Sequence, residues 1–322
     1  MALTATEHPG PEASASGPGW NPSRHSKQRS QRTREALTAW TMLSPAALLY
    51  LLFVAGPLMA AVILCFYNWD LLTAPQFAGF ENFTRLVTDG DTVRSLGNTF
   101  VFAFFAVVPH IGVGLALAIG INQAMPVLLR RILSTAFFFP MLISWAAVAL
   151  IWRYALDPNY GFINYYLAQI GIDAPNWFVE QAWAMPSLIA VDLWHSVGYT
   201  MVILLAGLQT IPAPLYEAAR VDGAGKLRQF WSITLPMLSP TFLFATVITF
   251  IGAFQIFDPM FIITNGGPSD STLSVVLDVY NTGFRDFSMG YASTKALMIV
   301  VVIMAVTLLQ LRLSRRWVNY DR

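Results

Sequence analysis

The chain has 322 residues, of which 56% are hydrophobic and only 11% are charged. Soluble domains usually carry about 25% charged residues, so this composition excludes a soluble globular protein and indicates an integral membrane protein. The formal net charge is only +1 and the basic residues are spread over several loops, which argues against a nucleic-acid partner, and the single cysteine, Cys65, excludes an internal disulfide.

The first 36 residues differ in composition from the rest of the chain. They are rich in proline, glycine and serine, and they end in a basic stretch that contains Arg24, Lys27, Arg29, Arg32 and Arg34. Because such a segment cannot bury enough apolar surface to form a core, we expect residues 1–36 to be a disordered, basic tail. The uncharged run that follows, from Ala36 to Trp69, is far too long for the apolar part of a cleavable signal.

Residues 37–322 are expected to form one transmembrane domain. A helix needs about 20 predominantly apolar residues to cross a bilayer. Six runs reach that length, near 40–66, 97–121, 132–153, 186–209, 237–262 and 289–312. The sequence therefore predicts an all-α membrane protein with six spans, whose two termini lie on the same side of the membrane.

Lysines and arginines decide which side that is, because they are more frequent at the cytoplasmic ends of spans. Most of the 19 lie in the tail, at Arg130 and Arg131, in the loop 211–236, and from residue 312 onward. We therefore expect both termini and the loop 211–236 to face the cytoplasm, in a multi-pass protein of the cell membrane.

The loop 211–236 contains the only charged, helix-forming island between two long apolar runs. Its Glu217–Arg220 stretch favours a helix, Gly223 and Gly225 permit a sharp turn, and Pro236 is expected to end the apolar face that follows. The segment predicts two short helices that meet at a bend in water.

A spaced pattern runs through this region. It consists of Glu217-Ala218-Ala219, Gly223, Ile233 and Leu235-Pro236, with Ala206-Gly207-Leu208-Gln209 and Ile211-Pro212 before it and Thr264-Asn265-Gly266-Gly267-Pro268 after it. The pattern resembles the cytoplasmic loop of permease subunits of binding-protein-dependent ABC importers, in the maltose-transporter-type branch that imports sugars and glycerol phosphates. The resemblance covers roughly the last third of the chain, and upstream of it the similarity is looser.

The resemblance implies a type I ABC importer permease fold, in which this loop forms a coupling helix that docks on an ATPase subunit. The residues it implicates in coupling are Glu217, Ala218, Ala219, Asp222, Gly223 and Ala224. It also implies a second related permease subunit, an ATPase dimer, an extracytoplasmic solute-binding protein and a sugar or polyol substrate as partners, besides membrane lipid. ATP and magnesium would bind to the ATPase subunits, so we expect no cofactor, metal or catalytic residue in this chain.

Polar residues inside the fourth predicted span are candidates for the solute path. Asp192 lies about two turns into that span, where a carboxylate costs roughly 2.5 to 3.5 kcal/mol and must face protein or water. His195, Ser196 and Tyr199 follow it at i+3, i+4 and i+7 and so share its helical face. These groups suit sugar hydroxyls. Alternatively, Asp192 and His195 pair with each other or with a neighbouring helix only to satisfy their own polarity.

The fifth predicted span would supply the opposite wall of the cavity. The residues of its corresponding face are Thr249, Gly252, Ala253 and Ile256, and Gln255 and Asp258 fall on an adjacent strip. Gly252 and Ala253 leave room for a solute rather than bind it.

Lys295 is unusual because it follows Gly290-Tyr291-Ala292-Ser293, where the resembled family usually continues with small or apolar residues. Its side chain could extend outward to water, pair with Asp258 or Asp278, or attract an anionic substrate such as a phosphorylated polyol. The three alternatives leave the substrate class open.

Two rival functions are weighed against the importer. An ATPase is disfavoured because Gly223-Ala224-Gly225-Lys226-Leu227 lacks the glycine spacing and the magnesium-binding hydroxyl of a phosphate loop. A stand-alone ion-coupled carrier, with Asp192 and His195 as its proton site, is the stronger rival. A carrier, however, has no evident need for a helical docking segment on its cytoplasmic side.

Overall fold

The computed structural model describes residues 35, 38–123, 125–315 and 317–318. The expected disordered tail, residues 1–36, therefore lies almost entirely outside the described residues. The chain divides into two compact units, Met1–Met59 and Ala60–Arg322, and the boundary falls within the first long helix. Each unit is described by itself.

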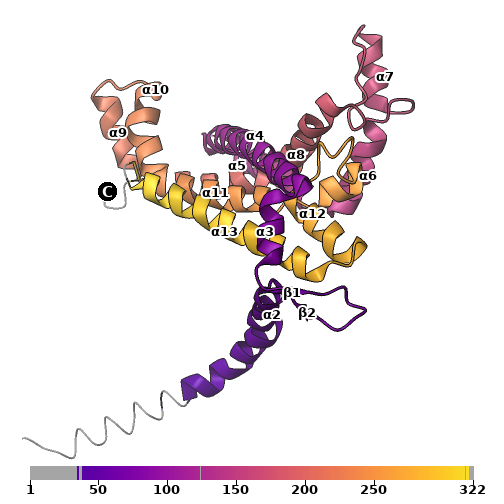
Figure 1. Ribbon diagram of the computed structural model, residues 1–322. Helices are drawn as coiled ribbons and strands as arrows, with labels where there is room; N and C mark the ends of the chain where they lie inside the picture. The colour runs from indigo at the N-terminus through magenta and orange to yellow at the C-terminus, as the bar shows by residue number, and fades with distance from the viewer. Residues whose placement is uncertain (1–34, 36–37, 124, 316, 319–322) are drawn as a thin grey trace, which may run out of the picture. The chain divides into compact units, whose positions relative to one another are not determined.

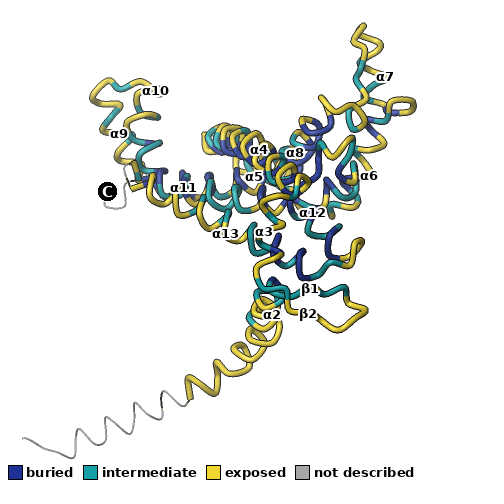
Figure 2. Tube along the Cα trace, viewed as in Figure 1, coloured by how far each residue is buried: buried dark blue, intermediate teal, exposed yellow. Residues whose placement is uncertain are grey.

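An apolar helix makes up nearly all of the described part of the first unit. It runs from Thr38 to Leu64, so its last residues belong to the second unit, and it includes a π-helical turn, η1 (Leu51–Ala55), followed by α2 (Gly56–Leu64). The residues from 38 to 54 are all exposed, as the yellow trace in Figure 2 shows. A helix that is apolar all round and uncovered by its own chain suits a lipid surface.

The core of the second unit forms where three long helices pack together (Figure 1): α4 (Gly90–Asn122), α8 (Gln181–Gln209) and α11 (Leu235–Phe254). Among the largest fully buried side chains are Phe102, Leu188, Met201 and Leu238. Their burial in the common interior of α4, α8 and α11 holds the walls of the cavity described below in place.

Short elements connect and flank these helices. They are β1 (Tyr67–Asn68) and its antiparallel partner β2 (Gln76–Phe77), then α3 (Glu81–Thr88), α7 (Phe162–Gln169), α9 (Ala213–Val221), α10 (Lys226–Gln229), η4 (Met260–Thr264), α12 (Val275–Tyr280) and η5 (Asn281–Arg285). The last helix is α13 (Met289–Ser314). The helix α12 is tied to α4, because the Val275 backbone N–H donates to Thr99 Oγ1 over 2.9 Å.

The third predicted span, near 132–153, is not one straight helix. The helices α5 (Val127–Phe138) and η2 (Phe139–Leu142) continue one another, and α6 (Trp145–Ala155) leaves them at 97°. Pro140 lies in η2, and Ile143 and Ser144 are extended, so the helical hydrogen bonding is interrupted there. Ser144 Oγ accepts from the Ala147 N–H and starts the new helix.

Pro236 does not end a helix, contrary to the expectation from sequence. A continuous helix runs from Lys226 to Phe254, through α10, the π-helical turn η3 (Phe230–Thr234) and α11. The π-helical turn η3 ends at Thr234, just before Leu235 and Pro236. Because the turn already departs from α-helical hydrogen bonding, the helix continues through Pro236 although proline has no N–H to donate.

The described residues include five helices that are long and apolar enough to cross a membrane, and a sixth span results if the bent pair α5–η2 and α6 is counted as one. The fold is thus an all-α membrane fold, as the sequence predicts.

Candidate functional site

A cavity of about 360 Å³ lies between α4, α8 and α11, at the point where the α5–α6 bend approaches them. Of the eight residues predicted to bind substrate, all except His195 line it. These are Asp192, Ser196, Tyr199, Thr249, Gly252, Ala253 and Ile256. The helical spacing of two separate spans therefore identified two facing walls of one cavity.

Sequence reasoning missed several other lining residues. They are Ala106, His110, Met141, Trp145, Thr200, Ile248, Gln255, Phe257 and Asp258. The signal for His110 was present in the sequence, because an ionisable residue in the middle of an apolar run is rare and needs a polar partner, whether it is a histidine or an aspartate. The contribution of the α5–α6 bend, through Met141 and Trp145, depends on the break in the third span and so could not be foreseen.

His110 is the ion-pair partner of Asp192. Its Nε2 atom lies 3.6 Å from Asp192 Oδ2, and both residues are buried, with 3% and 8% of their surface exposed. The other ring nitrogen, Nδ1, lies 2.7 Å from the Ala106 carbonyl oxygen, which can only accept, so Nδ1 carries a hydrogen. The contact at Nε2 therefore joins α4 to α8 through two buried side chains.

His195 does not line the cavity, which corrects the expectation from its i+3 spacing to Asp192. Its Nε2–H donates to the Ile143 carbonyl over 3.0 Å, and its Nδ1 lies 3.2 Å from Ser196 Oγ. The Trp145 ring packs on it, with centroids 4.1 Å apart. His195 therefore holds the extended residues of the α5–α6 bend against α8.

The predicted coupling segment bends where expected, but only its first helix, α9, is short, because α10 is the start of the long helix Lys226–Phe254. Here α9 ends at Val221, Gly223 has φ of +75°, and Gly225 precedes α10. A positive φ of this size favours glycine. The bend is fixed by hydrogen bonds, from the Ala224 N–H to the Ala219 carbonyl over 2.8 Å and from Gln229 Nε2 to the Ala224 carbonyl over 2.7 Å.

The surface of this bend is largely uncovered by the described chain. Glu217, Ala218, Asp222 and Gly223 are exposed, and Ala219 and Ala224 are half-buried. Two apolar side chains beside them are also open, with 88% of Val221 and 74% of Leu227 exposed. Large apolar side chains exposed next to a charged helix are typical of a surface that binds another protein.

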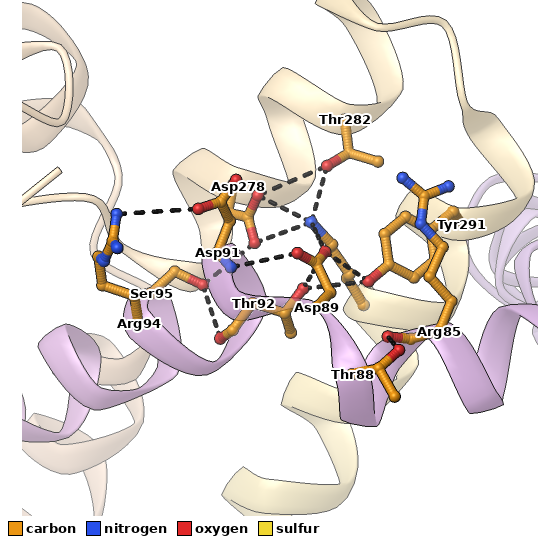
Figure 3. Close-up of polar contacts among 11 residues, drawn as sticks. Arg85, Thr88, Asp89, Asp91, Thr92, Arg94, Ser95, Asp278, Thr282 and Tyr291 are labelled. Carbon is orange, nitrogen blue, oxygen red and sulfur yellow. Dashed lines mark hydrogen bonds and ion pairs between the residues drawn. The ribbon is translucent and has the colours of Figure 1, made fainter.

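Lys295 is buried and paired with carboxylates, so the structure selects one of the three alternatives raised by the sequence. Figure 3 shows Asp89, Asp278 and Thr282, the side chains that it contacts. Its Nζ atom donates to both carboxylate oxygens of Asp278, over 2.9 and 3.0 Å, and to Thr282 Oγ1 over 3.0 Å. A second carboxylate, Asp89, lies 3.4 Å away. Asp258, the other partner considered, lines the cavity instead.

Asp89 connects this ammonium group to the start of α4. Its Oδ2 accepts from the Tyr291 hydroxyl over 2.6 Å and from Thr92 Oγ1 over 2.9 Å. Partial burial raises the pKa of Asp89, but these two hydrogen bonds and the charge of Lys295 outweigh burial and hold the pKa well below its usual range. Asp89 is therefore a carboxylate at neutral pH.

Comparison with known proteins identifies the family. The family model described as "Binding-protein-dependent transport system inner membrane component" matches residues 110–319. The probable ABC transporter permease protein YesP of Bacillus subtilis (strain 168) is 36% identical over 300 residues, which cover 92% of this chain and 96% of that protein. The sulfoquinovosyl glycerol transport system permease protein SmoG of Agrobacterium fabrum is 32% identical, over 87% of this chain and 91% of that protein.

A solved structure shares the fold. It is a crystal structure of a bacterial ABC transporter involved in the import of the acidic polysaccharide alginate, and its matching chain superposes with a TM-score of 0.80. The match covers 91% of this chain and 100% of that chain at 23% identity. At this identity the similarity is evidence of a common fold.

Proposed function

The chain belongs to the family of binding-protein-dependent transport system inner membrane components, and we propose that it forms half of the solute path of an ATP-driven importer of sugars or polyols. The family membership favours this function over a stand-alone ion-coupled carrier. In the proposed complex, a second related permease completes the path, an ATPase dimer binds on the cytoplasmic side and a solute-binding protein delivers the solute outside.

The observation that carries the proposal is the cavity between α4, α8 and α11. Its lining includes Ser196, Tyr199 and Thr249, which carry hydroxyl groups, and Trp145, which carries an aromatic ring. Hydroxyl groups both donate and accept hydrogen bonds, and aromatic rings pack on the apolar faces of sugars, so the lining suits a hydroxylated solute. The name of one relative, the multiple sugar-binding transport system permease protein MsmF of Streptococcus mutans, points to sugars as well.

The coupling segment is placed to move the cavity walls. The helix that begins at Lys226 continues to Phe254 and carries Thr249, Gly252 and Ala253, which line the cavity. Because a helix rises by about 1.5 Å per residue, a movement at Lys226 would be transmitted to Thr249 over roughly 35 Å. On the other side of the bend, α9 follows α8 after Thr210, Ile211 and Pro212.

This arrangement supports alternating access driven from outside the chain. Closure of the ATPase dimer on ATP would move the bend at Gly223 and thereby tilt α8 and α11, which opens the cavity to each side in turn. Glu217 would make polar contact with the ATPase, Gly223 would form the bend, and Val221 and Leu227 would pack in its groove. ATP and magnesium would be held by the ATPase subunits, so this chain would carry no ATPase site.

The proposed orientation places both termini and the α9–α10 bend in the cytoplasm. It rests on the distribution of lysine and arginine, three of which lie in the coupling segment itself: Arg220, Lys226 and Arg228. Labelling of single cysteines introduced at Arg228 and at Tyr160, in cells with an intact membrane, tests it. An impermeant thiol reagent added outside should label position 160 and leave position 228 unlabelled, and the reverse pattern would contradict the orientation.

The function is tested by ATPase activity in proteoliposomes that contain this chain with its second permease, its ATPase and its binding protein. Neutral mono- and disaccharides and polyols are added in turn. We expect at least one of them to stimulate hydrolysis several-fold in the presence of the binding protein. Failure of every sugar and polyol to stimulate hydrolysis, in a complex that is assembled and hydrolyses ATP, would contradict the proposed substrate class.

A further inference from the structure

The cavity carries acidic groups and lacks strongly basic ones. Two carboxylates, Asp192 and Asp258, line it, and none of the described residues lining it is a lysine or an arginine. The one histidine, His110, is engaged by Asp192 and by the Ala106 carbonyl. Asp258 is an exposed carboxylate of the lining, so acidic side chains outnumber basic ones around the cavity.

The one lysine buried in the described part of the chain cannot supply a positive charge to the cavity. Lys295 contacts both oxygens of Asp278 and lies near Asp89, so its single positive charge faces two carboxylates. All three of its ammonium hydrogens are accounted for by Asp278 and Thr282. It cannot bind an anionic solute without giving up these bonds.

Resting on the proposed function, we propose that this cavity selects neutral, hydroxylated solutes and rejects anionic ones such as uronic acids, sulfonated sugars and sugar phosphates. An anionic group in a site of low dielectric constant requires a counter-charge or several charge-assisted donors. This lining offers hydroxyl and amide groups, which satisfy neutral hydroxyl groups, and it adds repulsion from Asp258. Specificity of this kind arises from an unfavourable charge contact with the wrong solute.

The charge preference is a property of this lining and does not follow from the fold. The importer chain that shares the fold at a TM-score of 0.80 belongs to a transporter of the acidic polysaccharide alginate. Two chains of one fold can therefore serve solutes that differ in charge, because the side chains that line the cavity, and not the fold, decide which charge is accepted.

The experiment measures solute binding to the assembled permease–ATPase complex in nanodiscs without the binding protein, so that the binding protein does not filter the solutes. A radiolabelled neutral sugar that stimulates the ATPase is bound and then displaced by two unlabelled competitors of equal size. One competitor is the same neutral sugar, and the other carries a carboxylate in place of one hydroxymethyl group. The complex is prepared with the native chain, with Asp258→Asn, and with Asp173→Asn as a control.

We expect the neutral sugar to displace the label at a concentration at least about tenfold below that of the carboxylated one. Asp258→Asn should reduce the ratio of these two displacing concentrations, carboxylated over neutral, by a factor of about three or more. Asp173 is exposed and lies outside the cavity lining, so Asp173→Asn should leave the ratio unchanged.

Two results would overturn the inference in distinguishable ways. If the carboxylated sugar displaces the label as well as the neutral one, the charge preference is wrong while the sugar importer stands. If no sugar of either charge binds the complex or stimulates its ATPase, the proposed function itself fails and the inference falls with it.

Discussion

Lys295 Nζ lies 2.9 Å from Asp278 Oδ1 and 3.4 Å from Asp89 Oδ2, so a single ammonium group joins α13 to α12 and to the turn that precedes α4. The contact connects residues that are far apart in sequence. Because Lys295 is only 2% exposed and Asp278 5%, loss of the lysine would leave a carboxylate buried without a partner.

Lys295→Met should therefore destabilise the protein strongly. Removal of one member of a buried ion pair typically costs about 3 to 5 kcal/mol. We expect the thermal unfolding midpoint of the purified complex to fall by several degrees, and partial recovery when Asp278→Leu is added. The control is Arg94→Gln, because the Arg94–Asp270 pair at 3.2 Å is about half exposed on both sides and should contribute less than about 1 kcal/mol. Equal stability of Lys295→Met and Arg94→Gln would contradict this interpretation.

Asp89 should make stability depend on acid pH. Its pKa is lower in the folded protein than in the unfolded chain, so its stabilising effect is present at neutral pH and is lost as pH falls below about 4. Asp89→Asn should lower the unfolding midpoint at pH 7, and the difference from the native chain should shrink as pH is lowered toward 3. A difference that stays constant across this range would show that Asp89 does not titrate as described.

The bend at Gly223 should tolerate no branched residue. With φ of +75°, Gly223→Val forces a β-branched residue into the left-handed region, which costs about 1 to 2 kcal/mol or more and reshapes the bend. We expect uptake to fall at least about tenfold while the subunit still inserts and assembles. Gly225→Val is the matched control, since Gly225 has φ of −68° and open space around it. If uptake survives Gly223→Val, the conformation of this bend is not part of coupling.

Gly198 should be indispensable to the packing of α5 on α8. A Cβ atom at this position would collide with the carbonyl group of Phe137 and with the Cα atom of Phe138, and backbone atoms cannot turn aside. Gly198→Ala should lower stability by about 2 kcal/mol or more, in line with overpacked cores. Gly112→Ala is the control, because nothing lies within 4 Å of the new atom and alanine favours the helix. Comparable unfolding midpoints for the two variants would contradict the close approach.

The sequence predicted the features that depend on local spacing. The i, i+3, i+4, i+7 pattern placed Asp192, Ser196 and Tyr199 on one face of α8, and two glycines placed the bend between α9 and α10. The same pattern failed for His195, because Trp145 covers it and the Ile143 carbonyl binds it. Periodicity identifies a helical face, but it does not say which neighbour covers part of that face.

Other features depend on contacts between distant segments. The pairing of His110 with Asp192 joins α4 to α8, and no spacing rule predicts it. Two prolines, Pro140 and Pro236, show the same limit from opposite sides. Pro140 lies beside a 97° break, whereas Pro236 sits in a helix that remains continuous after a π-helical turn. The effect of a proline is thus set by whether the surrounding helix can supply an alternative hydrogen-bonding pattern.

We expect this chain to move solute only as part of an ATP-driven complex, and uptake into reconstituted vesicles distinguishes this from transport by the chain alone. Uptake of a labelled neutral sugar is followed in proteoliposomes that hold either this chain alone or the full set of permeases, ATPase and binding protein, with ATP inside or with a proton gradient and no ATP. We predict uptake only by the full set with ATP. Uptake by the chain alone under a proton gradient would contradict this expectation and would make the His110–Asp192 pair the centre of an ion-coupled mechanism.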